Sequence, residues 1–231
     1  MSKDETMTSS AAWSRLLALP VVAILRGIRP HEVSPVAEVL GLAGVQTMEV
    51  PLNSPSAIES IHLLCQRGQH LVGAGTVLTP SQVDEVADAG GQLILSPNMN
   101  PEVIARTVER GLISIPGVAT ITEAFAALQA GAHALKLFPA DALGLSTIKA
   151  WRAVLPNNTK LICVGGVTEH NVSQYALAGA DGVGLGSSLY TPGISTASLH
   201  RKAKAVIHAW GSPSAFAQHA PRLDLAVELE S

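Results

Sequence analysis

The stretch Ala130-Gly131-Ala132-His133-Ala134-Leu135-Lys136-Leu137-Phe138-Pro139 contains the structural unit that decides the fold. A helical pattern ends at its Ala-Gly pair, because glycine adopts the left-handed conformation that stops a helix. A short apolar run follows and predicts a buried strand over residues 133–138. The same junction recurs along the chain and predicts helices alternating with parallel strands.

Eight apolar runs predict eight strands whose starts are 20 to 27 residues apart. The predicted strands are Val21–Leu25, Gln46–Val50, Leu71–Gly75, Gln92–Ser96, Leu112–Ile115, His133–Phe138, Lys160–Val164 and Asp181–Leu185. The predicted helices between them are Pro30–Leu42, Pro55–Arg67, Pro80–Ala89, Pro101–Arg110, Thr122–Ala130, Thr147–Val154 and Thr168–Ala178. Three of these helices have a predicted cap followed by proline, at Ser54-Pro55, Thr79-Pro80 and Asn100-Pro101. Eight such units predict an α/β protein with a (β/α)8 TIM barrel, and an open doubly wound sheet is the alternative.

The predicted domain organisation has three parts. Residues 1–10 are expected to form a flexible N-terminus, 11–210 the barrel domain and 211–231 a C-terminal extension. A helix over residues 8–17 is expected to lie across the bottom of the barrel.

Composition limits the classes of partner. The 231 residues carry a formal charge of −3 and no cluster of Lys and Arg, which argues against nucleic acid or an anionic membrane. No apolar stretch reaches membrane-spanning length, and the polar N-terminus lacks the pattern of a signal peptide. Cys65 and Cys163 lie in separate apolar runs and are predicted to be reduced, which suits the cytoplasm.

Lys136 is the strongest chemical signal in the chain. An amine inside an apolar strand is costly to bury unless it is paired or used. Burial disfavours the ammonium form, so such a lysine can become neutral and nucleophilic enough to form a Schiff base. The structural alternative is a lysine that extends from a strand end to a surface carboxylate.

The other candidate residues follow from barrel geometry, because active sites of such barrels lie at the C-terminal ends of the strands. Those ends carry Arg26, Glu49 and Thr76, together with Lys136. Alternation places Thr47 and Glu49 inside the barrel, and likewise Ala134, Lys136 and Phe138. One acid and two cations would then share a pocket, unless they form an ion-paired plug.

Two glycine turns follow the seventh and eighth predicted strands, Val164-Gly165-Gly166-Val167-Thr168 and Gly184-Leu185-Gly186-Ser187-Ser188. Backbone N–H groups in these turns, with a short helix expected to start near Ser187, predict a phosphate site. No metal site is predicted, since the histidines lack ligand spacing and Glu49 is the only carboxylate expected in the pocket.

These segments together resemble a known family. The motifs are Ile24-Leu25-Arg26-Gly27, Met48-Glu49-Val50-Pro51-Leu52-Asn53-Ser54-Pro55, Gly73-Ala74-Gly75-Thr76-Val77, Leu135-Lys136-Leu137-Phe138-Pro139 and the two glycine turns. They resemble the class I aldolases that act on 2-keto-3-deoxy-6-phospho sugar acids, the 2-keto-3-deoxy-6-phosphogluconate/4-hydroxy-2-oxoglutarate aldolase family. The resemblance covers roughly residues 13 to 210 and implies cleavage to pyruvate and D-glyceraldehyde 3-phosphate, without a cofactor or metal, by a cytoplasmic homotrimer.

The resemblance also implies roles for the candidate residues. Lys136 would form the Schiff base, and Glu49 would transfer protons through a water. Arg26 and Thr76 would bind the pyruvyl carboxylate, and Phe138 would pack on the pyruvyl portion. Val164 would border the C4 region of the substrate, while Gly165, Gly166, Gly186 and Ser187 would hold the phosphate.

Within the family, two positions favour a galacto-configured substrate. The gluconate-type branch usually has arginine where this chain has Asn53, and threonine where it has Val164. The gluconate-type or hydroxyglutarate-cleaving activity is the alternative inside the family. A metal-dependent sugar-phosphate epimerase and a non-catalytic phosphate-binding barrel are the alternatives outside it.

Overall fold

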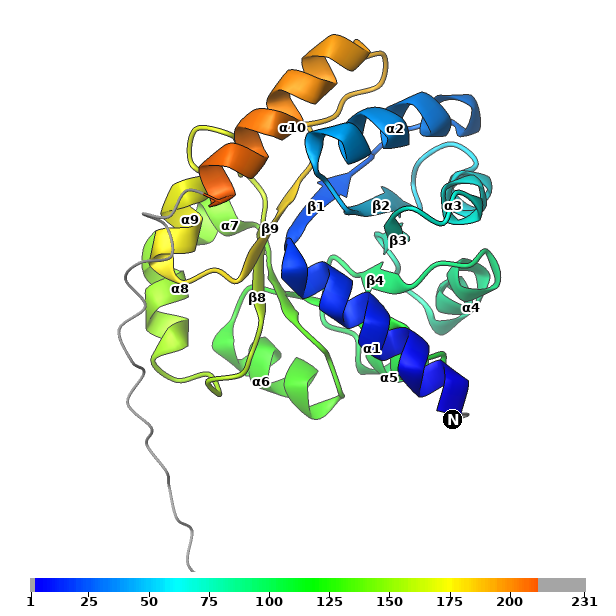
Figure 1. Cartoon of the computed structure of the whole chain (residues 1–231). Helices are drawn as coiled ribbons and strands as arrows, with labels where there is room; N and C mark the ends of the chain where they lie inside the picture. The colour runs from blue at the N-terminus through cyan, green and yellow to red at the C-terminus, as the bar shows by residue number, and fades with distance from the viewer. Residues whose placement is uncertain (1–2, 212–231) are drawn as a thin grey trace, which may run out of the picture.

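The computed structural model describes residues 3–211, with side chains described from residue 11 onward. Its first helix, α1 (Lys3–Ala18), lies across one end of a ring of strands (Figure 1). This helix begins five residues before Thr8, the predicted start. The predicted extension lies outside the described residues, except for Gly211.

The strands form one parallel sheet within the described residues. They are β1 (Val21–Ile24), β2 (Thr47–Pro51), β3 (Leu71–Gly75), β4 (Leu93–Leu95), β5 (Ile113–Ser114), β6 (Gly117–Val118), β7 (Leu135–Leu137), β8 (Leu161–Val164) and β9 (Gly182–Leu185). Their order is β5-β4-β3-β2-β1-β9-β8-β7-β6, with every pair parallel.

The sheet closes into a barrel through the segment that contains β5 and β6. On one side, the Ile115 N–H donates to the Ile94 carbonyl at 2.9 Å. On the other side, the Lys136 N–H donates to the Pro116 carbonyl, also at 2.9 Å. The sequence predicted one strand here, Leu112–Ile115. The structure has β5 inside that range and a further short strand, β6, after Pro116, which has no N–H to donate and interrupts the ladder. The barrel prediction is confirmed, and the open-sheet alternative is wrong.

Helices surround the strands on the outside (Figure 1). After α1 they are the 3-10 helix η1 (Pro30–Glu32), α2 (Val33–Ala43), α3 (Ala57–Gln66), α4 (Pro80–Asp88), α5 (Pro101–Glu109), α6 (Ile121–Gln129), α7 (Ala140–Leu143), α8 (Leu145–Arg152), α9 (Val172–Ala178) and α10 (Thr196–Gly211). The short α7 was not predicted, and α9 begins later than the predicted Thr168.

The core has two parts, as expected when successive strand residues point to opposite faces. The larger part lies between the strands and the surrounding helices. The smaller part fills the barrel with Val22, Ile24, Leu71, Leu93, Leu95, Ile113, Ile115, Ala134, Ile162 and Val164. Ala12 and Leu16 of α1 belong to this inner cluster, so α1 closes the N-terminal end of the barrel.

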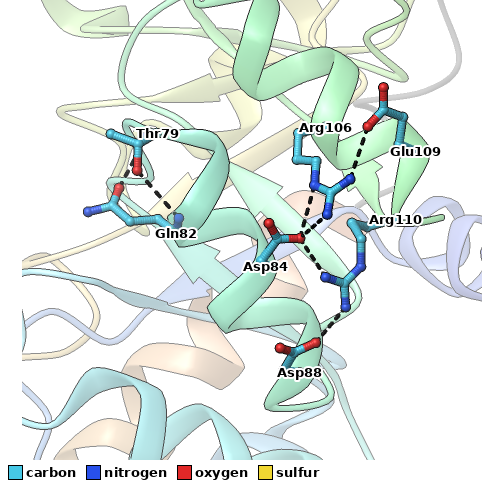
Figure 2. Close-up of polar contacts among 7 residues, drawn as sticks. All are labelled: Thr79, Gln82, Asp84, Asp88, Arg106, Glu109 and Arg110. Atoms are coloured by element: carbon cyan, nitrogen blue, oxygen red, sulfur yellow. Dashed lines mark hydrogen bonds and ion pairs between the residues drawn. The ribbon is translucent and has the colours of Figure 1, made fainter.

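Two of the three predicted helix caps are confirmed. Thr79 and Gln82 form a reciprocal capping box at the start of α4 (Figure 2), and the Asn100 side chain accepts from the Glu102 N–H at 3.0 Å. The cap at Ser54-Pro55 is wrong, because α3 starts at Ala57 with Ser56 as its N-cap. Ser54 instead accepts a hydrogen bond from the backbone N–H of Gly27 at 2.9 Å.

An ion-pair network joins α4 to α5 on the surface (Figure 2). Asp84 accepts from Arg106 and Arg110, and Arg110 also binds Asp88. The hydrogen bond from Arg106 is the main reason that the pKa of Asp84 lies below its ordinary value. The network lies outside the barrel interior and is separate from the candidate site.

Two further expectations concern the cysteines and the membrane. Cys65 and Cys163 are both free, as predicted. Within residues 3–211, none of the helices combines the length and apolar character needed to cross a membrane.

Candidate active site

Lys136 on β7 and Glu49 on β2 are both buried inside the barrel, with exposed fractions of 6% and 2%. Each affects the ionisation of the other. They nevertheless form no direct ion pair in the described part of the chain. The two groups are therefore electrostatically coupled without a direct ion pair between them.

The carboxylate of Glu49 lies directly over Gly75, at the end of β3. A Cβ atom at Gly75 would lie 2.2 Å from Glu49 Oε2 and 2.4 Å from Oε1, so only glycine leaves room for the carboxylate. The Gly75 N–H also hydrogen-bonds this carboxylate, whereas Oε2 has no hydrogen-bond partner among the described residues. Burial raises the pKa of Glu49 to about 7, although Lys136, Arg26 and the Gly75 N–H each lower it. A group with that pKa can both give and take a proton near neutral pH.

The pKa of Lys136 is lowered from its ordinary value. Burial is the largest cause, and the Arg26 charge acts in the same direction, while the Glu49 charge raises it. The net direction agrees with the prediction that burial disfavours the ammonium form of Lys136. The Nζ atom lies 4.8 Å from the centroid of the Phe138 ring. A lysine in this environment is neutral more often than an exposed one and is more nucleophilic.

Arg26 follows β1 at the rim of the barrel and is exposed. Its Nη1 donates to the Asn53 side chain at 2.6 Å, from the loop that follows β2. The same two loops are joined by the hydrogen bond between Gly27 and Ser54. Sequence reasoning had noted Asn53 as a difference from a family branch but had not predicted its contact with Arg26.

An open cavity of about 380 Å³ lies at the C-terminal end of the barrel. Its lining residues are Ile24, Arg26, Phe138, Val164, Gly165, Gly166, Val167, Thr168, Gly184, Gly186, Ser187 and Ser188. Seven of the predicted site residues line this cavity, but Lys136, Glu49 and Thr76 do not. The Nζ atom of Lys136 lies over the ring of Phe138, which lines the cavity. Thr76 follows Gly75 and has a left-handed backbone (φ 58°). An ion-paired plug that fills the barrel mouth is therefore wrong.

Only glycine fits at positions 165 and 166, in the turn after β8. Gly165 and Gly166 both have positive φ, 103° and 67°, which side chains rarely adopt. A Cβ atom at Gly165 would lie 3.1 Å from the Ala140 nitrogen, and one at Gly166 would lie 2.3 Å from the Asp141 Cβ. The turn is therefore held open at the cavity, where its backbone can approach a ligand.

The second glycine turn follows β9 and is tied to the first. Ser188 Oγ donates to the Val167 carbonyl at 2.6 Å. The short helix expected near Ser187 is wrong: the N–H groups of Leu189 and Tyr190 both donate to the Gly186 carbonyl, which forms a single turn. Pro192 follows two residues after Tyr190 and has no N–H with which to continue a helix.

Two further hydroxyl residues, Thr168 and Ser188, line the cavity. Both end the glycine turns that the sequence predicted, two positions after Gly166 and Gly186, but neither was named there as a phosphate-holding residue. No group of three metal-ligating side chains occurs in the described part of the chain.

Known proteins resemble this chain in sequence and in fold. The chain matches the KDPG and KHG aldolase family over residues 13–204. It is 47% identical over 193 residues to a probable 2-dehydro-3-deoxy-6-phosphogalactonate aldolase of Rhizobium meliloti (strain 1021), covering 83% of this chain and 91% of that protein. It is also 47% identical over 194 residues to the 2-dehydro-3-deoxy-6-phosphogalactonate aldolase of Escherichia coli (strain K12), covering 83% and 95%.

A solved structure of native KDPGal superimposes with a TM-score of 0.83 and 46% identity, covering 87% of this chain and 97% of that one. The shared sequence spans the barrel and every candidate residue, from Arg26 to Ser187. This chain belongs to the KDPG and KHG aldolase family.

Proposed function

We propose that the protein is a class I aldolase that cleaves 2-dehydro-3-deoxy-6-phospho-D-galactonate to pyruvate and D-glyceraldehyde 3-phosphate. The observation that carries the proposal is a buried lysine with a lowered pKa beside a buried glutamate whose pKa is about 7. The cavity above them, with its two glycine turns, supports a phosphorylated substrate. The names of the relatives with 47% identity support the galactonate configuration.

The reaction starts at Lys136. Its neutral amine attacks the C2 ketone, and loss of water from the carbinolamine gives an iminium. Deprotonation of the C4 hydroxyl then lets the C3–C4 bond break, and its electron pair moves toward the iminium to form an enamine. D-glyceraldehyde 3-phosphate leaves, C3 of the enamine takes a proton, and hydrolysis of the resulting iminium releases pyruvate.

Glu49 transfers the protons in this scheme. Carbinolamine dehydration needs an acid, the C4 hydroxyl needs a base, and C3 of the enamine needs a proton donor. A single carboxyl group can serve each step if its pKa is close to the working pH. The Oε2 atom of Glu49 has no hydrogen-bond partner among residues 11–211 and supports this role, because it can bind a substrate hydroxyl or a water.

The remaining residues bind the ends of the substrate. Arg26, with Thr76, binds the pyruvyl carboxylate, which a guanidinium can do with two hydrogen bonds. Phe138 packs against the pyruvyl portion. Gly165, Gly166, Gly186 and Ser187 present backbone N–H groups to the phosphate at the opposite end of the cavity.

The substrate configuration is tested with a lyase assay on the two C4-epimeric phosphorylated acids. We expect the galacto epimer to be cleaved faster, and Val164→Thr to raise relative activity on the gluco epimer. Val164 lines the cavity beside Gly165 and has no hydrogen-bonding group, whereas threonine is nearly isosteric and can bond a hydroxyl. Such a contact is worth about 1 kcal/mol, or roughly tenfold in relative rate. Equal wild-type rates that do not respond to Val164→Thr would contradict the galactonate assignment and leave the aldolase proposal standing.

We further propose a cytoplasmic homotrimer. The two free cysteines are consistent with a reducing compartment. Sedimentation equilibrium should give three times the chain mass of 23.9 kDa. A mass of one or two chains in dilute solution would contradict the trimer.

A further inference from the structure

The two loops that carry Arg26 and Asn53 are fastened together at the rim of the barrel. They follow the neighbouring strands β1 and β2, where Ile24 is paired with Glu49. One fastening is the hydrogen bond from the Gly27 N–H to Ser54 Oγ, which fixes the backbone of the first loop. The other runs from Arg26 Nη1 to Asn53 Oδ1 and fixes the end of the arginine side chain.

The position of the Arg26 guanidinium therefore depends on Asn53. An exposed arginine has many accessible rotamers, and its charge is spread over them unless a partner selects one. At 2.6 Å the contact with Asn53 is short, and it is the side-chain hydrogen bond that the structure gives Arg26 in the described residues. Its effect is to hold the guanidinium at the wall of the cavity.

The chemical nature of Asn53 matters as much as its position. An amide oxygen accepts a hydrogen bond from a guanidinium without neutralising its charge. A carboxylate in the same place would form an ion pair with Arg26 and oppose its field. That field reaches the interior, because the Arg26 charge lowers the pKa of both Lys136 and Glu49.

We infer that Asn53 is a positioning residue for the aldolase reaction, holding the Arg26 guanidinium oriented between the pyruvyl carboxylate and Lys136. The inference rests on the proposed function, since it gives Arg26 its carboxylate-binding role. It assigns two separable effects to one side chain: orientation, which the hydrogen bond supplies, and an unopposed Arg26 field, which follows from the neutrality of the amide.

Two variants separate these effects, with borohydride trapping of the pyruvate imine as the readout. Asn53→Leu removes the acceptor and adds no charge, so half-saturation by pyruvate should rise about tenfold while the pH midpoint of trapping stays in place. Asn53→Asp keeps an acceptor but opposes the Arg26 charge, so the pKa of Lys136 should rise. The neutral amine then prevails only at higher pH, and the midpoint of trapping should move upward.

Ser54→Ala is the matched control, because it removes the neighbouring fastening and leaves the Arg26–Asn53 contact. It should keep half-saturation within about twofold of wild type and leave the pH midpoint unmoved. If all three variants lower Tm alike and none changes half-saturation or the pH midpoint, Asn53 only stabilises the loop and the inference is wrong. Failure of the wild-type protein to trap pyruvate at Lys136 would instead overturn the proposed function, so the two failures are distinguishable.

Discussion

Pyruvate and borohydride together should inactivate the protein irreversibly and attach a reduced pyruvyl group to Lys136. The neutral amine that burial favours forms an imine with the ketone, and hydride reduces that imine to a stable secondary amine. Lys136→Arg keeps a positive charge but cannot form the imine, so both lyase activity and adduct formation should be abolished. Peptide mapping by mass spectrometry locates the adduct, and lyase activity should survive treatment with a chelator.

Lys149 and Lys160 provide the comparison for this experiment. Lys149 is exposed on α8, and Lys160 binds Asp181 at the other end of the barrel. Neither has the environment that would make it reactive, so Lys149→Arg and Lys160→Arg should trap pyruvate as the wild type does. An adduct on either lysine, or one that persists in Lys136→Arg, would contradict the Schiff-base assignment.

Much of the fold could be predicted because its signals are local and repeated. Each Ala-Gly helix end and each apolar run indicates one more strand–helix unit. An error at one boundary therefore does not change the number of units predicted. The alternation of strand residues predicts Glu49 and Lys136 inside the barrel, and both are buried there. Lys136 could be identified because a charged side chain is rarely buried in an apolar strand without a function or an ion-pair partner.

The errors lie where a distant group competes with a local signal. Ser54-Pro55 has the sequence of a helix cap, but the Gly27 N–H from the preceding loop binds the serine hydroxyl instead. The predicted fifth strand ends at Ile115, whereas the barrel is completed beyond it by the Pro116 carbonyl and β6. The contact between Arg26 and Asn53 joins residues 27 positions apart and depends on how two loops meet, which no linear pattern encodes.

The pKa of Glu49 is another property that the sequence did not predict. The sequence placed one acid and two cations in one pocket but gave no direction for the pKa of Glu49, because that direction depends on how completely the barrel excludes water. With Glu49 2% exposed, burial outweighs two neighbouring cations and raises its pKa to about 7. An exposed glutamate would be ionised at neutral pH. Buried Glu49 instead exchanges its proton near that pH.

Glu49→Gln should preserve the fold and pyruvate binding while lowering turnover by about 10²–10⁴, the usual contribution of a positioned acid–base group. Gln is nearly isosteric with Glu and fits over Gly75, but it cannot exchange a proton. The wild-type rate should change with an apparent pKa near 7 that the variant lacks. Slow trapping of the pyruvate imine should persist, since Lys136 remains in place.

The same substitution should also stabilise the protein, in a way that depends on pH. The folded protein holds the Glu49 proton more tightly than the unfolded chain, whose glutamate has a pKa of about 4.5. Burying the group therefore costs little below pH 4.5 and increasingly more as the pH rises toward 7. Glu49→Gln should accordingly raise the free energy of unfolding at pH 8 by on the order of 1–3 kcal/mol. This gain appears as a higher Tm at pH 8 and should vanish at pH 4. A turnover loss below tenfold, with no pH-dependent gain in Tm, would mean that the proton carrier lies elsewhere, because a glutamate buried for catalysis must both exchange protons and destabilise the folded state when it is ionised.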